Sequence, residues 1–463
     1  MDKAKVAVVT LGDSRREFYQ KRAHIAQAEL EKIKQVFDDK YDLYFSPIIF
    51  DEKEGLAAAD TIRQKGITAV ILHLPIWATP SLCLRPAFCT DAPVLLLGNK
   101  QRDTSSLVTL LAVAGMLEQA GKSCIRVSGD FFDEEIQAEV DTYVNACALV
   151  DQIRRSSFGM IGGRSIGIGT TVADPSQWQK VFGTEFDHCD QYEIVYRANC
   201  IEPERLQKHL NWVKEHFGIG YGENFNEQKL ELQVRSYLAL KDMAQEKHYD
   251  FMGIKCQQDM SDHFVLQCLG VGLLNNTYDA DGPKKAIPTS CECDCDGAMT
   301  MRLLNLCAKG QPSCLLDIKF FDSEEKEFIL ANCGAAAPYF ADPDSSIEAM
   351  KKVTLLPHIF GLAGGGAMQM IAKPGSVTVA RLFRRDGKYV LGCFEGVTEM
   401  RPLEELKKTT WCYPHAFIRA EVDYDLFFRT INSNHLHLAY GKYAKVLELF
   451  CKMVGIDYIN YNT

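Results

Sequence analysis

The residues best suited to chemistry are carboxylates in two short segments. The first is the run Cys291-Glu292-Cys293-Asp294-Cys295-Asp296-Gly297, and the second ends at Asp317, 25 residues after Glu292. Two carboxylates that lie close together repel each other, and a bound divalent cation would screen that repulsion and lower both pKa values. On spacing alone, a solvated acidic turn ahead of a helix explains the run as well as a metal site does, with Asp296 as a plain N-cap.

The elements that would position these carboxylates follow from the residues between them. Ala298–Lys309 has apolar residues at helical spacing and is followed by Gly310, so we expect a strand, a helix and a second strand. A right-handed crossover would place Glu292 and Asp317 at the same carboxyl edge of one parallel sheet. Open α/β sheets build their binding sites along that edge.

The cysteines of the acidic run alternate with the acids. If the run is extended, the three cysteines share one face and the three acids share the other. The thiols are too close in sequence for the usual zinc-binding spacing, so we favour buried thiols over a thiolate metal site. Seventeen cysteines in a chain without a recognisable secretion signal predict reduced thiols that lie mostly in cores.

A third candidate ligand lies near the C-terminus, in the segment Ile431–Gly441 with Asn434, His435 and His437. In a strand these two histidines point the same way, and either is an acceptable metal ligand. A lone histidine is more often a hydrogen-bonded core residue, but a site that already holds two carboxylates favours the ligand interpretation.

The glycine-rich segment Gly162–Gly169 superficially suggests phosphate binding. It lacks the Gly-Lys-Ser/Thr ending of a P-loop and has no G-x-G-x-x-G in register after a strand. We therefore interpret it as a tight connection between domains rather than as a ligand loop. No Ser/His/Asp or Cys/His nucleophile motif stands out.

The wider pattern predicts an α/β fold class with two doubly wound α/β domains followed by a C-terminal antiparallel β-barrel-like domain. Short Val/Ile/Leu-rich runs alternate with helical patterns in the first part, which is typical of a flavodoxin-like sheet buried on both faces. The last part is β-rich with turn residues between its strands. The expected domains are a flavodoxin-like domain, a second α/β domain with Glu292 and Asp317, and a β-rich domain with His435, over residues 1–155, 156–350 and 351–463.

Charge and hydropathy exclude some classes of protein. The formal net charge is −10, the pI is about 5.6, and no run of Lys or Arg exceeds two residues, so we expect no nucleic-acid partner. No stretch approaches 18 consecutive apolar residues, so we expect no membrane span. The first residues lead directly into a strand and lack the features of a signal peptide, which predicts a cytoplasmic protein.

Taken together, these residues resemble the L-fucose isomerase/L-arabinose isomerase superfamily, and the fucose isomerase branch more closely. The resemblance covers the whole chain in domain order and is most specific at Ser290–Met299, at Asp317 and at Asn434-His435 followed by Ala439-Tyr440-Gly441. It implies that Glu292, Asp317 and His435 hold one divalent cation, commonly Mn²⁺, with Mg²⁺ or Co²⁺ as alternatives. It also implies that Glu292 and Asp317 are the catalytic proton-transfer pair, and it leaves open which of them is the base.

Weaker matches imply the residues that bind substrate. These are Gln257 in a Gly-x-x-x-Gln loop, Trp411 and His415 in an aromatic and polar wall, Asn434, and Arg15 or Arg16 reaching a neighbouring subunit's pocket. The resemblance further implies a homotrimer or homohexamer with shared active sites.

The implied activity is aldose–ketose isomerisation through an enediol intermediate, an intramolecular oxidation and reduction. The chain is much shorter than the fucose enzymes, which leaves open a fucose- or arabinose-like sugar or a C6-modified hexose such as sulfoquinovose. Two other classes remain: a non-catalytic cytoplasmic sugar-binding protein, and a metal-dependent aldolase or hydrolase, for which no further base or second metal motif is found.

Overall fold

The computed structural model describes residues 3–342, 346–409 and 413–463. The chain separates into two compact units, Met1–Asp151 (unit 1) and Gln152–Thr463 (unit 2). Within either unit, no helix in the described part of the chain is long and apolar enough to cross a membrane. The three-domain division at residues 155 and 350 stays a prediction.

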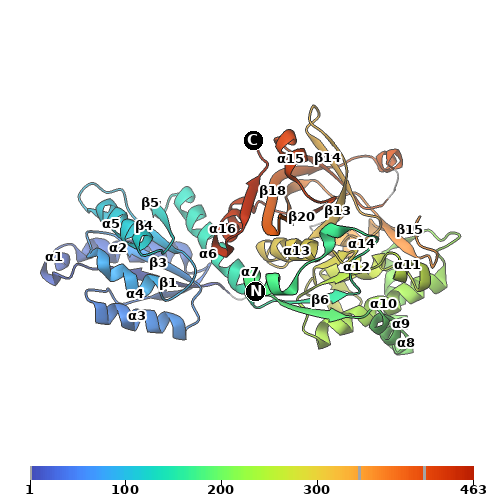
Figure 1. Cartoon of the computed structure of the whole chain (residues 1–463), viewed down its shortest axis with the longest axis horizontal. Helices are drawn as coiled ribbons and strands as arrows, with labels where there is room; N and C mark the ends of the chain where they lie inside the picture. The colour runs from blue at the N-terminus through green and yellow to red at the C-terminus, as the bar shows by residue number, and fades with distance from the viewer. Residues whose placement is uncertain (1–2, 343–345, 410–412) are drawn as a thin grey trace. The chain divides into compact units, whose positions relative to one another are not determined.

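Unit 1 is a five-stranded parallel sheet with the order β2-β1-β3-β4-β5 (Figure 1). That order is typical of flavodoxin-like doubly wound folds, which confirms the predicted class. The strands are β1 Lys5–Thr10, β2 Asp42–Phe45, β3 Ala69–Leu74, β4 Val94–Gly98 and β5 Cys124–Ser128. The main helices are α2 Ala23–Phe37, α3 Glu52–Gln64, α5 Ser106–Gln119 and α6 Glu134–Arg154.

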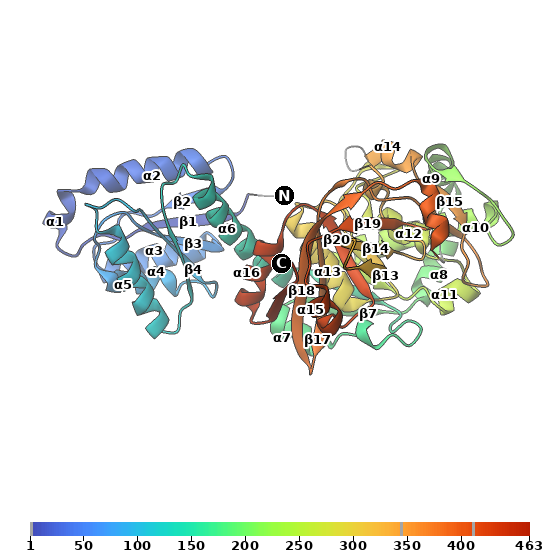
Figure 2. The same cartoon turned by 90° about the horizontal axis from the view of Figure 1, so that it is seen from above.

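Helices cover both faces of this sheet, with α2 and α6 on one side and α3 and α5 on the other (Figure 2). This arrangement explains why the strands are nearly continuous apolar runs: β3 and β4 are buried along their whole length. Local capping fixes the start of α3, where the Asp51 carboxylate accepts a hydrogen bond from the Glu54 amide at 2.9 Å.

Unit 2 begins with a second parallel sheet of order β12-β9-β6-β7. Its strands are β6 Ser157–Ile161, β7 Glu185–Cys189, β9 Phe251–Ile254 and β12 Thr289–Cys291. The helices around it include α7 Pro175–Phe182, α8 Tyr192–Asn199, α9 Pro203–His216, α10 Glu227–Glu246, α12 Cys268–Asn275 and α13 Cys295–Cys307. A smaller sheet joins β8 Gly218–Ile219, β15 Thr354–Pro357 and β16 Gly366–Gln369.

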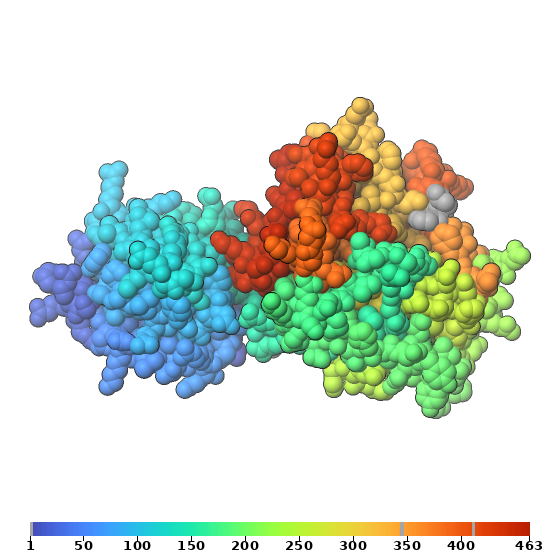
Figure 3. All heavy atoms as spheres, viewed as in Figure 1, coloured from blue at the N-terminus to red at the C-terminus, as the bar shows by residue number. Residues whose placement is uncertain are grey.

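The rest of unit 2 is a seven-stranded, mostly antiparallel sheet of order β17-β20-β13-β14-β19-β18-β21. Because β17 also pairs with β18, six of these strands close into a ring, as expected for a barrel-like domain. The strands are β13 Cys314–Asp322, β14 Glu327–Ala331, β17 Gly375–Arg385, β18 Lys388–Glu399, β19 His415–Arg419, β20 His435–Tyr440 and β21 Asp457–Asn460. Within unit 2, the orange and red C-terminal residues pack against the green residues of the α/β part (Figure 3).

The strand that carries Asp317 lies in a different sheet from the one expected. β12 pairs with β9 in the parallel sheet, whereas β13 pairs antiparallel with β14 and β20 in the ring. The prediction that Glu292 and Asp317 lie at one edge of a single parallel sheet is therefore wrong. Only Ser323–Lys326 separate β13 from β14, and a connection that short can join antiparallel strands but not parallel ones.

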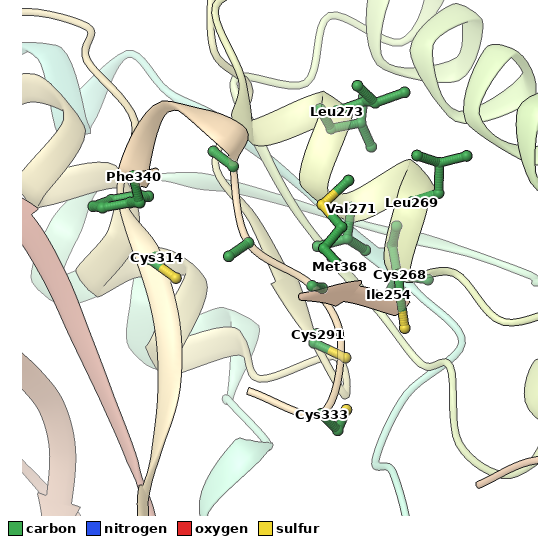
Figure 4. Close-up of a cluster of buried hydrophobic side chains, with 14 of the residues drawn as sticks. Ile254, Cys268, Leu269, Val271, Leu273, Cys291, Cys314, Cys333, Phe340 and Met368 are labelled. Atoms are coloured by element: carbon green, nitrogen blue, oxygen red, sulfur yellow. The ribbon is translucent and has the colours of Figure 1, made fainter. Parts of the chain in front are cut away.

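Cysteines contribute to the core of unit 2 as small apolar side chains. Figure 4 shows Cys268, Cys291 and Cys333 among Ile254, Leu269, Val271 and Met368. Every cysteine in the described ranges is a free thiol, and most are buried, which confirms the predicted placement in cores.

Candidate metal centre and active site

Glu292 lies in a strained turn directly after β12. Glu292 and Cys293 have φ values of 60° and 52°, in the left-handed region that costs a non-glycine residue roughly 1–2 kcal/mol. The Cys293 amide holds the turn by donating to the Ile254 carbonyl of β9 at 2.9 Å. Such strain persists where surrounding structure enforces it, commonly at functional sites. The run over 291–296 is therefore not extended, because the strand ends at Cys291.

The acids after this turn are buried, so they are not a solvated surface turn. Glu292, Asp294 and Asp296 are 9%, 0% and 1% exposed. The N-cap of α13 is Asp294, which accepts from the Gly297 amide at 2.9 Å, and not Asp296, which the alternative of a solvated turn had as the cap. The N-cap therefore lies two residues earlier in the chain than Asp296. Asp296 instead accepts from Trp178 Nε1 at 3.3 Å and from Tyr389 Oη at 3.2 Å.

His435 brings the three predicted metal ligands together. It opens β20, where it lies opposite Asp317 of β13 in the antiparallel register. Its Nε2 atom is 3.1 Å from Glu292 Oε2 and 3.6 Å from Asp317 Oδ1. Nε2 is buried, and its contact with Glu292 is an ion pair without the geometry of a hydrogen bond. A buried imidazole nitrogen without a hydrogen bond, flanked by two carboxylates, fits a divalent cation, because these three groups are ligands that Mn²⁺ and similar ions accept.

Burial and neighbouring charges shift the pKa values of His435 and Asp317. Burial raises the pKa of Asp317, and the nearby Glu292 charge adds to this, while His435 opposes it. Burial would lower the pKa of His435, but the Asp294 and Glu292 carboxylates raise it to about 10. Without a metal, a protonated imidazole therefore balances the carboxylates, and a bound cation would replace that proton.

Asn434 contacts this cluster, and Gln257 follows the strand that pairs with β12. Asn434 Nδ2 donates to Asp317 Oδ1 at 2.9 Å, which holds that carboxylate beside His435. Gln257 follows the end of β9, whose neighbour β12 leads into Glu292. Gln257 Nε2 donates to Cys333 Sγ at 3.9 Å, and Ser165 Oγ donates to the Gln257 carbonyl at 2.5 Å. The glycine-rich segment, interpreted as a connection, therefore also contacts the loop of Gln257.

His415 lies on a different strand from the two residues of the cluster in the ring, Asp317 and His435. It lies on β19, two strands from Asp317, because Ala331 of β14 pairs with both residues. Its Nδ1 donates to the Tyr413 carbonyl at 2.6 Å, and its Nε2 lies 3.0 Å from Thr409 Oγ1. Burial lowers the pKa of His415. Its predicted substrate contact would require breaking one of these interactions.

Three further predicted substrate residues are not brought to the cluster by the structure. Trp411 lies outside the described residues. Arg15 and Arg16 belong to unit 1, where Arg15 pairs with Asp13 at 2.7 Å and Arg16 with Glu54 at 2.7 Å. Their role at a neighbouring subunit's pocket stays a prediction.

The sequence interpretation missed two buried charges on the Nδ1 side of His435. Asp294 Oδ2 accepts from His435 Nδ1 at 2.7 Å and forms an ion pair with Arg381 Nη1. Arg381 Nη2 donates to the Thr170 carbonyl at 3.0 Å, and the side chains of Asp294 and Arg381 are both 0% exposed. The signal that could have found Arg381 is a single charge inside the apolar run Val377–Phe383.

A second group of possible ligands lies elsewhere in unit 2. Single ligand atoms of His209, Asp279 and Asp281 lie within 4.8 Å of one another. Lys241 Nζ, however, lies 2.7 Å from a carboxylate oxygen of both aspartates, and Lys208 Nζ is 2.7 Å from Asp281. Ammonium groups already balance these carboxylates, so we assign this group to a structural ion-pair network.

Comparison with known proteins decides the family. Three models of L-fucose isomerase match successive parts of the chain: the first N-terminal domain over residues 3–154, the second N-terminal domain over 156–244 and the C-terminal domain over 330–462. The chain belongs to the L-fucose isomerase family. This confirms the resemblance found in the sequence.

The family's curated members are distant relatives. The L-fucose isomerases of Streptococcus pneumoniae strains Taiwan19F-14, CGSP14 and Hungary19A-6 are each 21% identical over 306 residues. These alignments cover 59% of this chain and 52% of each relative, so the chain spans about half the length of the curated relatives it matches. Asn434 and His435 lie within the matched C-terminal domain of the L-fucose isomerase family, whereas Glu292 and Asp317 lie between matched ranges. The roles of these carboxylates therefore rest on geometry.

Proposed function

We propose that this member of the L-fucose isomerase family is a divalent-metal-dependent aldose–ketose isomerase with its centre at Glu292, Asp317 and His435. One observation carries the proposal: His435 Nε2 is buried without a hydrogen bond, 3.1 Å and 3.6 Å from the two carboxylates. Carboxylate oxygens and an imidazole suit Mn²⁺, with Mg²⁺ or Co²⁺ as alternatives. When bound, the cation would supply a Lewis acid for negative charge that develops on the sugar oxygens.

The two carboxylates are the proposed proton carriers. Conversion of an aldose to its 2-ketose removes a proton from C2, returns one to C1 and moves one from the O2 hydroxyl to O1. Glu292 and Asp317 approach His435 from different sheets, so they can address an open-chain sugar from different directions. One takes the carbon proton and the other moves the hydroxyl proton. Asn434 holds Oδ1 of Asp317 during this exchange.

The substrate is proposed to be a fucose- or arabinose-like sugar or a hexose modified at C6. An anionic C6 group would need a basic partner. Lys255 pairs with Asp259, and Arg15 and Arg16 pair with acids of unit 1. Arg164 is exposed and directly precedes Ser165, which contacts the Gln257 loop. We therefore propose Arg164 as the side chain to meet an anionic group.

The test is conversion of a sugar panel by the Mn²⁺-loaded protein in D2O, followed by NMR. The panel contains L-fucose, L-arabinose, D-arabinose, D-glucose and a 6-sulfonated glucose. We expect a ketose with deuterium at C1, deuterium at C2 of the remaining aldose as the reaction reverses, and no product after EDTA treatment. A ketose without deuterium would point to hydride transfer or to a proton shielded from solvent, and would reopen the roles of Glu292 and Asp317. Bound metal with no conversion would favour a sugar-binding protein, and cleaved products would favour an aldolase.

We also propose assembly into a homotrimer or homohexamer in which Arg15 or Arg16 reaches a neighbouring pocket. Light scattering after size-exclusion chromatography measures the number of subunits. A monomer that isomerises sugar at full rate would contradict the shared site.

A further inference from the structure

The buried ion pair of Asp294 and Arg381 has no assigned role. Asp294 Oδ1 caps α13 through the Gly297 amide, and Oδ2 accepts from both His435 Nδ1 and Arg381. Arg381 is held in turn by the Thr170 carbonyl. A continuous chain of contacts therefore runs from the segment after β6 through β17 and the start of α13 to the imidazole of His435.

A charged pair is not needed for the cap. Asparagine or serine caps a helix about as well as aspartate does. Burying two charges also costs desolvation energy that their attraction often fails to recover, so a fully buried pair is weak evidence for a role in stability. Asp294 and Arg381 are both fully buried, and their ion pair lies directly behind His435.

The position of the pair matches a requirement of metal-binding histidines. An imidazole offers a bare Nε2 to a metal only when Nδ1 carries the proton, and a carboxylate acceptor at Nδ1 fixes that arrangement. Here the acceptor at Nδ1 is Asp294, at 2.7 Å, and Nε2 faces Glu292 and Asp317.

Gly297 has no side chain, and this leaves room for Asp294 and His437. A Cβ atom at this position would lie 2.6 Å from Asp294 Oδ2 and 2.6 Å from His437 Nε2. Both atoms belong to short side chains in a fully buried region, so neither can move aside easily. A side chain at position 297 would therefore displace the acceptor of His435.

We propose that Asp294 and Arg381 are a positioning pair for His435. Arg381 fixes Asp294, and Asp294 holds His435 with Nδ1 protonated, so that Nε2 is presented to the cation between Glu292 and Asp317. This inference rests on the proposed function. It adds two residues that neither contact substrate nor bind the cation.

Three variants test the pair in the full-length protein. Asp294→Asn keeps the cap but removes the charged acceptor, and it leaves Arg381 buried without its partner, which can prevent folding. Asp294→Asn/Arg381→Gln avoids the unpaired charge. Gly297→Ala leaves every charge in place and displaces Asp294. The matched control is Asp296→Asn in the same acidic run, because Asp296 contacts Trp178, Tyr389 and Arg384 rather than His435.

The readout is the Kd for Mn²⁺ of the folded protein, measured by electron paramagnetic resonance of free Mn²⁺, together with a thermal melt. Loss of a group that orients a metal-binding histidine typically weakens binding about 10- to 100-fold. We expect that loss in every folded variant of the pair, and a change of less than about twofold in Asp296→Asn. A merely structural role would lower the melting temperature and leave the Kd unchanged, which would overturn the proposal.

The ring tautomer of wild-type His435 gives a test that needs no folded variant of the pair. In ¹⁵N-histidine-labelled protein with Mg²⁺, assigned with His435→Gln, we expect a protonated Nδ1 and an Nε2 shift on metal addition. A protonated Nε2 in the metal-loaded protein would overturn the proposal. Failure of the wild type to bind Mn²⁺ or Mg²⁺ would instead overturn the proposed function. Wild-type binding with unchanged variants would overturn only the positioning pair.

Discussion

At the scale of single residues, the centre depends on where each acid of one short run points. Glu292 reaches His435 because its backbone is left-handed, Asp294 turns to the opposite nitrogen of the same ring, and Asp296 packs among aromatic side chains. Three acids spaced two residues apart thus face three different environments. A different prediction follows from each environment.

Removing the charge of Glu292 should abolish most of the activity without unfolding the turn. Glu292→Gln preserves the length of the side chain and does not alter the backbone requirement. We expect turnover of the sugar to fall at least about 100-fold, because proton transfer by a positioned carboxylate contributes that much or more. The measurement is kcat with Mn²⁺, with Glu185→Gln on the exposed end of β7 as the control. Retention of more than about a tenth of the turnover would contradict the assignment.

Asp296 should make the stability of the protein depend on pH. Burial raises the pKa of Asp296 to about 6 in the folded protein, against the positive charge of Arg384. The folded state therefore favours the protonated form, and the stability from this group is fully present below the unfolded pKa of 3.8 and lost as pH rises through about 6.

This dependence is measured as the unfolding free energy of wild type minus that of Asp296→Asn, which cannot titrate. Between about pH 4 and about pH 7 we expect the difference to fall by on the order of 3 kcal/mol, the equivalent of about two pKa units. Urea unfolding at several pH values gives both free energies. A difference that is flat or rises with pH would show that Arg384 outweighs burial.

At the scale of elements, α13 connects the parallel sheet to the ring. Its first turn holds Asp294, and Thr300 one turn later bonds to β17: Thr300 Oγ1 accepts from the Leu382 amide at 2.9 Å and donates to the Asp296 carbonyl at 2.8 Å. Leu382 and Thr300 are fully buried. The helix thereby fixes the distance between the Glu292 turn and the strands of the ring.

Thr300→Val should weaken this connection. Valine keeps the shape of threonine but leaves the buried Leu382 amide without an acceptor, which costs roughly 1–3 kcal/mol. Thr300→Ser retains the hydroxyl and loses one buried methyl group, at about 1 kcal/mol. We expect Thr300→Val to be the more destabilising variant in urea unfolding. Wild-type stability of Thr300→Val would mean that the hydroxyl contributes nothing to the packing of α13.

At the scale of the whole molecule, all the proposed metal ligands and their positioning pair belong to unit 2. Glu292 follows a strand of the parallel sheet, and Asp317 and His435 lie on paired strands of the ring. Arg15 and Arg16 belong to unit 1, and their contact with a neighbouring subunit stays a prediction.

Unit 2 should therefore bind the metal by itself. We expect a fragment of residues 152–463 to fold and to bind Mn²⁺ with a Kd within about threefold of the full chain, because every ligand and every residue that orients one is present. The fragment should lose isomerase activity if Arg15 or Arg16 completes the pocket. Circular dichroism and Mn²⁺ titration check the first expectation. A folded fragment that binds no Mn²⁺ would place part of the metal centre in unit 1.

Local pattern was sufficient for much of the fold. The short apolar runs of unit 1 predicted a doubly wound sheet, because strands buried on both faces, such as β3, need continuous apolar side chains. The pairing of strands was harder. The sequence pattern indicated that β13 is another parallel strand. Only its short hairpin with β14 places it in the ring.

The sequence by itself determined the chemistry available: two carboxylates 25 residues apart, a histidine after an asparagine, and a family resemblance that the comparisons confirm. Only the tertiary structure decided how these groups meet. Glu292 reaches His435 through a left-handed turn, and Asp317 reaches it through a strand pairing 118 residues distant in the sequence. The roles of Asp294 and Arg381 depend on burial and direction, and neither is encoded in spacing along the chain. Residue type limits which bonds are possible, whereas the packing of separate sheets selects the ones that form.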